Sequence, residues 1–200
     1  MTHSPRPHRP VVREPAALEA IGVGSDPIAE LHAAHETAAV LLRTGRAADD
    51  PAVVARLVAL VDALGIETLA DLWATRPAQT LPGALWRLYV LREWVTSRPD
   101  NAARDYAAGA PVAEAEHAVA GADPAGPEEV RRVIDEVLRG VFTGDFAVAL
   151  ERAAAFCRVV STGRTESGVS IAGLEQAWRL RDLANDLGAC AQLWRNERLH

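Results

Sequence analysis

The 200-residue sequence contains no lysine, and its positive charge comes from 21 arginines. Exclusive use of arginine is typical of a high-GC coding bias. We therefore interpret it as a sign of bacterial origin, not of a site that requires guanidinium groups. The net charge of −6 argues against broad nonspecific binding to nucleic acid or to anionic membranes.

Long apolar runs are also missing, and the only cysteines are Cys157 and Cys190. No run approaches the roughly 18 to 20 residues that a helix needs to span a bilayer. The first residues show no apolar stretch of a secretory signal. Both cysteines lie in alanine-rich helical stretches without a Cys-x-x-Cys spacing. We expect a cytoplasmic protein with no membrane partner, in which two reduced thiols pack as small hydrophobic residues.

Aromatic residues make up 5% of the chain, and the β-branched residues that favour strands are also scarce. Alanine, the best helix former, supplies 39 residues. An apolar fraction of 49% still allows a sizeable core. The composition predicts an all-α fold, an irregular multi-helix bundle of about eight or nine helices around a central apolar helix at about 82–98.

Helix start and stop signals divide the chain into segments. Asp26-Pro27 and Asp50-Pro51 each offer a capping side chain followed by proline at the first helical position. Thr80 is the expected cap of the central helix, which Pro99 ends. The expected helices are 27–43, 51–64, 67–74, 82–98, 100–106, 112–119, 128–140, 145–161 and 171–198.

The domain organisation follows from proline and glycine content. Residues 1–24 form a basic, proline-rich arm that we predict to be disordered. Residues 25–200 form the helical domain. Its possible sub-halves are 25–109 and 127–200, joined by the Ala/Gly/Pro-rich segment 110–126.

The predicted central helix carries two charged residues, Arg92 and Glu93, on apolar faces. At 100° per residue, Arg92 falls among leucines and Glu93 falls between Trp86 and Tyr89. Buried charges need partners, and adjacent helical residues do not face each other. Each side chain must therefore bind a group from another helix.

Two interpretations of this pair remain open. In the first, which we favour, ion pairs with other helices fix the helix register. In the second, Arg92, Glu93, Trp86 and Tyr89 form a ligand pocket in which Arg92 binds an anion. The candidate partners are Asp62, Glu67 and Asp71 for Arg92, and Arg56 and Arg179 for Glu93.

The first predicted helix holds a histidine cluster, His32 and His35 followed by Glu36. These spacings allow helical side chains to converge, and imidazole with carboxylate suits zinc or iron. The alternative is that His35, at the centre of an apolar face, is a core histidine bonded to a carbonyl or carboxylate. The apolar face expected around it consists of Ile28, Leu31, Ala38, Ala39 and Leu42. We favour the alternative and expect no cofactor.

The last predicted helix carries Trp178, Arg181 and Trp194, residue types that protein interfaces favour. A packed helix with a solvated, salt-bridged face is the simpler interpretation. No phosphate-binding loop, nucleophile elbow or Ser/His or Cys/His pair is recognisable in the sequence.

These observations lead us to expect a non-enzymatic helical interaction or regulatory protein, with a protein partner or a second copy of itself. One alternative is a small-molecule or metal-binding helical enzyme. Another is a DNA-binding regulator that uses Arg6, Arg9 and Arg13 of the N-terminal arm.

Overall fold

The computed structural model describes residues 26–167 and 171–200, which form ten α-helices and no strand. The all-α prediction is therefore confirmed, whereas the predicted arm lies outside the described residues. The helices are α2 (Pro27–Arg46), α3 (Pro51–Val58), α4 (Leu60–Leu64), α5 (Ile66–Trp73), α6 (Leu81–Ser97), α7 (Pro99–Gly109), α8 (Glu114–Ala120), α9 (Pro127–Thr143), α10 (Phe146–Glu166) and α11 (Ile171–Arg195).

The predicted capping residues begin their helices as expected. Asp26 accepts a hydrogen bond from the Ile28 amide at 3.0 Å, and Asp50 accepts one from the Ala52 amide at 2.8 Å. The Thr80 hydroxyl accepts from the Gly83 amide at 3.2 Å. Each bond satisfies an amide that the first turn of a helix leaves without a backbone partner.

The helix expected at 51–64 is divided in two. Ala59 leaves helical geometry, with φ −88° and ψ 18°, and separates α3 from α4. Beyond this break Val61 is buried, and the Asp62 carboxylate binds Arg92 of α6. The break is one reason why the described residues contain ten helices and not eight or nine.

The buried face of α2 differs from the predicted one. Ala38 and Leu42 are buried as expected, but the stripe continues through Ala34 and Gly45. Ile28 and Leu31, which were assigned to the apolar face, are 65% and 38% exposed. The prediction was wrong there because it assigned the buried face of this helix from side-chain hydrophobicity alone. In the fold, small residues pack α2 closely against Trp73 and α9.

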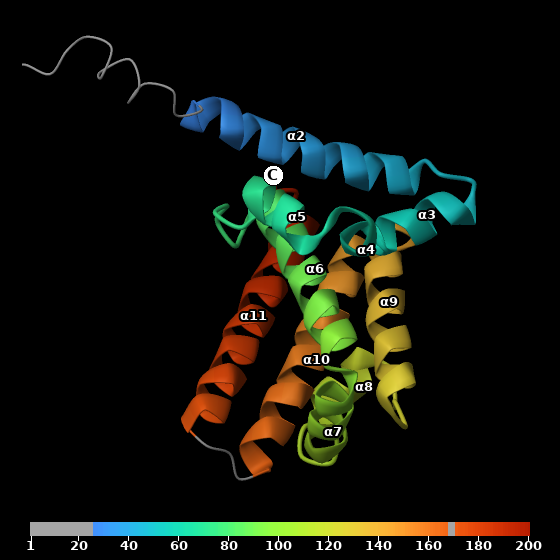
Figure 1. The fold of residues 1–200 in the computed structure, drawn as a ribbon, viewed down its shortest axis with the longest axis vertical. Helices are drawn as coiled ribbons and strands as arrows, with labels where there is room; N and C mark the ends of the chain where they lie inside the picture. The colour runs from blue at the N-terminus through green and yellow to red at the C-terminus, as the bar shows by residue number, and fades with distance from the viewer. Residues whose placement is uncertain (1–25, 168–170) are drawn as a thin grey trace, which may run out of the picture.

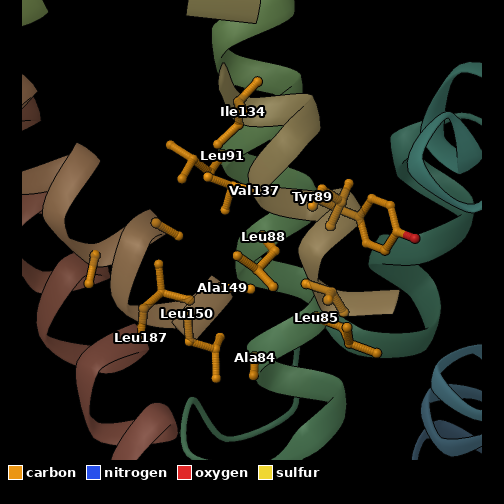
Figure 2. Packing of buried hydrophobic residues seen from close by; sticks show 14 of the residues in the cluster. Ala84, Leu85, Leu88, Tyr89, Leu91, Ile134, Val137, Ala149, Leu150 and Leu187 are labelled. Atoms are coloured by element: carbon orange, nitrogen blue, oxygen red, sulfur yellow. The ribbon is translucent and has the colours of Figure 1, made fainter. Parts of the chain in front are cut away.

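The core lies between α6 and α10. In α6, ten of the 17 residues are buried, and in α10, 14 of the 21. Figure 2 shows Leu88 of α6 among side chains from three other helices, represented by Val137, Leu150 and Leu187. Because both helices contribute to one cluster, the groups that they carry are held at fixed separations.

The remaining helices surround this core (Figure 1). α2 lies across one end of the bundle, near the C-terminus, and α10 contacts α7, α8, α9 and α11. The segment 110–126 contains α8, which packs on α10. Among residues 26–167 and 171–200, no helix combines the length and hydrophobicity needed to cross a membrane.

Candidate functional site

Arg92 lies in the core, where two carboxylates hold it. Its Nη1 and Nη2 atoms each donate to Asp62 of α4 at 2.9 Å, and its Nε donates to Asp135 of α9 at 2.7 Å. Burial lowers the pKa of Arg92, but the hydrogen bonds and charges of Asp62 and Asp135 raise it above its ordinary value. Arg92 thus joins α4, α6 and α9 in one ion-pair network.

The other members of the predicted ligand pocket lie in different surroundings. The Tyr89 hydroxyl donates to the Leu57 carbonyl at 2.7 Å, and its ring stacks on Trp73 at a centroid distance of 6.3 Å. Glu93 is half-buried, and no described residue forms an ion pair with it. Trp86 lines a groove on the face of α6 that is turned away from Arg92. The structure therefore does not bring the four side chains to one cavity.

A groove of about 570 Å³ lies between α6 and α11, and we call it the α6–α11 groove. The two helices run in opposite directions, come close near the C-terminus and diverge away from it (Figure 1). Helix geometry places this face of α6 opposite Arg92. The apolar lining consists of Ala74, Trp86, Val90, Leu91, Trp94, Leu180 and Leu183.

The α6 wall of the groove carries a ridge of side chains that runs along one face of the helix. Trp86, Val90 and Trp94 follow one another at intervals of four residues, a spacing that places helical side chains on one face. Arg98, the residue directly after α6, extends the line by one more turn, since its amide donates to the Trp94 carbonyl at 3.1 Å. At a rise of 1.5 Å per residue, the ridge is about 18 Å long. Both tryptophans are half-buried. The groove therefore presents two aromatic side chains in a line.

One end of the groove has matched charges. Arg87 of α6 donates through Nε to Asp186 of α11 at 2.9 Å, and through Nη1 to the Gly83 carbonyl at 3.2 Å. We call this the Arg87 end. The ion pair joins α6 to α11 where the two helices come close.

At the opposite end, the Trp94 end, a buried arginine lies beside an aromatic ring. Arg164 of α10 donates through Nε to Asp105 of α7 at 2.8 Å, and through Nη1 to Gln176 of α11 at 2.9 Å. Its guanidinium lies over the Trp94 ring, 5.4 Å from the centroid. Arg164 and Asp105 are both buried, so the position of this part of the wall is fixed by α7 and α10.

Two further arginines line the groove without such partners. Arg98 and Arg179 are exposed, and neither forms an ion pair with a described residue. Asp182, which also lines the groove, lies one turn beyond Arg179 towards Asp186. The free positive charges therefore lie towards the Trp94 end.

The groove offers binding groups and few groups that suit catalysis. Its described lining residues include no histidine, cysteine, serine or tyrosine, so no hydroxyl or thiol nucleophile lies beside a histidine base. The carboxylates are Asp182 and Asp186, and Asp186 is paired with Arg87. Apolar surface with a few charged groups is an arrangement that recognises ligands or partners.

The predicted metal ligands lie along the exposed part of α2. His32 and Glu36 are exposed, and His35 is half-buried with its Nδ1 bonded to the Leu31 carbonyl of the same helix at 2.8 Å. Among the described residues, no group of three or more His, Cys, Asp or Glu side chains is suited to a metal ion. The metal hypothesis therefore gains no support from the geometry.

The predicted interface residues of α11 lie on different parts of the surface. Trp178 is 63% exposed, and Arg181 is also exposed. Trp194 is half-buried, packs edge-on against Phe146 with ring centroids 4.9 Å apart, and lies under the Arg46 guanidinium. The structure does not bring the two tryptophans into one patch.

Both cysteines are buried free thiols, as the sequence predicted. Burial raises the pKa of Cys157 to about 12 and that of Cys190 to about 11. At neutral pH both remain protonated, and a protonated thiol is a poor nucleophile. The thiols therefore offer no reactive site.

Sequence reasoning missed the groove, although part of its signal was present. Trp86, Val90 and Trp94 form a ridge with a period of four residues, which a search for aromatic side chains at helical spacing would have found. The opposite wall begins about 80 residues later in the chain, so the sequence does not show that α11 faces this ridge.

Comparisons with known proteins point to no function for this chain, so its function is inferred from the geometry of the structure. The chain matches no protein-family model, no curated protein and no solved structure. The α6–α11 groove is the described feature that best combines apolar surface with convergent charge.

Proposed function

We propose that this protein is a non-enzymatic interaction protein whose α6–α11 groove binds an amphipathic helical segment of a protein partner. The observation that carries the proposal is the line formed by Trp86, Val90 and Trp94 along an open groove. Amphipathic helices bind such grooves through apolar side chains spaced three, four and seven residues apart.

The dimensions of the groove favour a helix. A ridge of about 18 Å matches about twelve helical residues, or three turns. The volume of about 570 Å³ also lies within the range of small-molecule sites. However, the groove is open to solvent and would leave one side of a small ligand exposed. An amphipathic helix, in contrast, binds such a groove through its apolar face and keeps its polar face in solvent.

The residue types support the same proposal. Tryptophan and arginine are enriched among the side chains that contribute most to protein interfaces. Trp86 and Trp94 already lose part of their exposure in the fold, and Arg164 holds the Trp94 ring from below. A partner therefore meets a wall that is already ordered, which lowers the entropy cost of binding.

The test is selection of helical peptides on the full chain. A displayed library of 16-residue peptides in a helical host is enriched for binders, and the affinity of a synthetic peptide is measured by fluorescence anisotropy. Trp86→Ala and Trp94→Ala should each weaken binding about 30-fold or more, since truncating a central aromatic costs about 2 kcal/mol.

Trp178→Ala is the matched control because it removes an exposed tryptophan of α11 outside the groove. It should change the affinity less than twofold, and circular dichroism should show that all three variants are folded. Failure to obtain any peptide that depends on Trp86 or Trp94 would contradict the proposal. A small molecule retained in native mass spectrometry, and released by Trp94→Ala, would favour the small-molecule alternative instead.

A further inference from the structure

The two ends of the α6–α11 groove differ in charge, and this difference indicates which charges a bound helix carries. The inference rests on the proposed function. At the Arg87 end, Arg87 and Asp186 neutralise each other at 2.9 Å. At the Trp94 end, Asp105 neutralises Arg164. Arg98 and Arg179 then remain as charges that no described residue pairs.

The relative positions of these two arginines follow from the contacts of their neighbours. Arg98 directly follows the last residue of α6 and lies one turn after Trp94, and Arg179 follows Gln176 by three residues on α11. Arg164 contacts both Trp94 and Gln176, so it joins the two helices at this level of the groove. Because the two helices run in opposite directions, Arg98 lies outside this level and Arg179 lies about one turn inside it, on the opposite wall. Both arginines are still nearer to the Trp94 end than to the Arg87–Asp186 pair.

We propose that the partner helix carries a block of aspartate or glutamate residues at one end, and that Arg98 and Arg179 bind this block at the Trp94 end. Guanidinium and carboxylate form paired, charge-assisted hydrogen bonds. A helix bound in the reverse direction would place its acidic block beside Asp186 and Asp182. The charges therefore fix the direction of the bound helix.

Arg164 acts as a positioning residue in this arrangement. Asp105 and Gln176 occupy its Nε and Nη1 atoms, and Trp94 covers its plane. It holds Trp94 and α11 in place, whereas the exposed arginines supply the free charge. Charge at the rim of an interface contributes mainly to the association rate and to the choice of partner.

The experiment uses the helical peptide library described above, which contains acidic, neutral and basic residues at every position. Peptides selected on the wild-type chain should carry apolar residues at helical spacing, with aspartate or glutamate concentrated at one end. Replacing that acidic block by glutamine should weaken binding at least 10-fold at 50 mM salt, and the difference should shrink at 500 mM salt.

Variants of the protein test the assignment to the two arginines. The double variant Arg98→Glu, Arg179→Glu should bind the acidic peptide at least 10-fold more weakly, and a peptide with an arginine block should restore the affinity. Arg181→Glu is the control for each of the two replacements, because it reverses one charge at an exposed position of α11 outside the groove. It should alter binding less than twofold.

The outcomes separate this inference from the proposed function. Some selected peptides could depend on Trp86 and Trp94 but bind equally well with a glutamine block in place of the acidic block. That result would overturn the proposed acidic block and would still support a helix-binding groove. Equal weakening by Arg181→Glu would show a general charge effect, and it would also overturn the assignment. A selection that yields no tryptophan-dependent peptide would overturn both.

Discussion

Gly163 of α10 lies in backbone contact with Gly109 of α7, and neither position has room for a side chain. A Cβ atom on Gly163 would overlap the Asp105 carbonyl oxygen, and one on Gly109 would overlap the Val159 carbonyl oxygen and lie 2.8 Å from the Gly163 amide nitrogen. This close crossing places Asp105 and Arg164 together in the interior, where they form the buried ion pair behind the groove.

Gly163→Ala should therefore destabilise the protein strongly. The added methyl group meets backbone atoms that do not move independently, so α7 and α10 must separate, at a cost of about 3 kcal/mol or more. The measurement is the free energy of unfolding in urea. Gly188→Ala is the matched control within a helix, since its Cβ would lie 3.4 Å from Arg158 Nη2. It should stabilise the protein by up to about 1 kcal/mol because alanine is the better helix former. Equal effects of the two changes would contradict the close crossing.

The Arg92 network should contribute to stability and not to binding. Arg92→Ala removes three hydrogen bonds to carboxylates. Because Asp62 is 53% and Asp135 34% exposed, water compensates part of the loss, and we expect a cost of about 2 kcal/mol in urea unfolding. Arg132→Ala, at an exposed ion pair with Glu129, should cost less than about 0.5 kcal/mol.

Arg92→Ala also distinguishes a structural role of Arg92 from a role in a ligand pocket. Arg92→Ala should bind the selected helical peptide with unchanged affinity as long as the protein is folded. A variant that remained fully stable but lost peptide binding would instead favour a pocket at Arg92.

The two tryptophans predicted as interface residues should differ in their effect on stability. Trp194→Ala removes the ring that packs on Phe146 and beneath Arg46, at a cost of about 2 to 3 kcal/mol. Trp178→Ala removes a ring that is 63% exposed and should cost less than about 0.5 kcal/mol. Thermal unfolding followed by circular dichroism measures both. A large loss at Trp178 would indicate a contact, such as a second copy, that covers this ring in solution.

Stability should decline in alkali because four buried acids hold their protons in the folded state. Burial raises the pKa of Cys157 to about 12, of Cys190 to about 11 and of Tyr106 to about 12, and it raises the pKa of Tyr89 as well. In the unfolded chain thiols ionise near pH 8.5 and phenols near pH 10. The stabilisation is therefore complete below about pH 8.5 and is lost as the pH rises towards 12.

Urea unfolding between pH 7 and pH 11 measures this decline. Each group that is protonated when folded and ionised when unfolded contributes a slope of about 1.4 kcal/mol per pH unit. The double variant Cys157→Ala, Cys190→Ala should start from a lower stability at pH 7, since both thiols are packed in the core. It should then lose less between pH 9 and pH 10. An identical slope in the variant and the wild type would contradict the raised thiol pKa values.

The starts of these helices could be predicted because they depend on residues that are neighbours in the sequence. Asp26-Pro27 and Asp50-Pro51 begin helices through hydrogen bonds within two residues of the cap. The need of Arg92 for a carboxylate also followed from the sequence, because a charge on an apolar face must be paired. Asp62 was among its predicted partners, whereas Asp135, on a helix more than 40 residues later, was not identified.

By itself, the amino-acid sequence determined the helical class, most helix starts and the requirement that Arg92 be paired, since these depend on local hydrogen bonding, backbone preferences and the cost of burying charge. Only the tertiary structure decided which faces meet. It exposed Ile28 and Leu31, brought Gly109 against Gly163, and placed Trp94 opposite α11. These pairings depend on how well whole helix surfaces fit together, and that fit joins residues from distant parts of the chain.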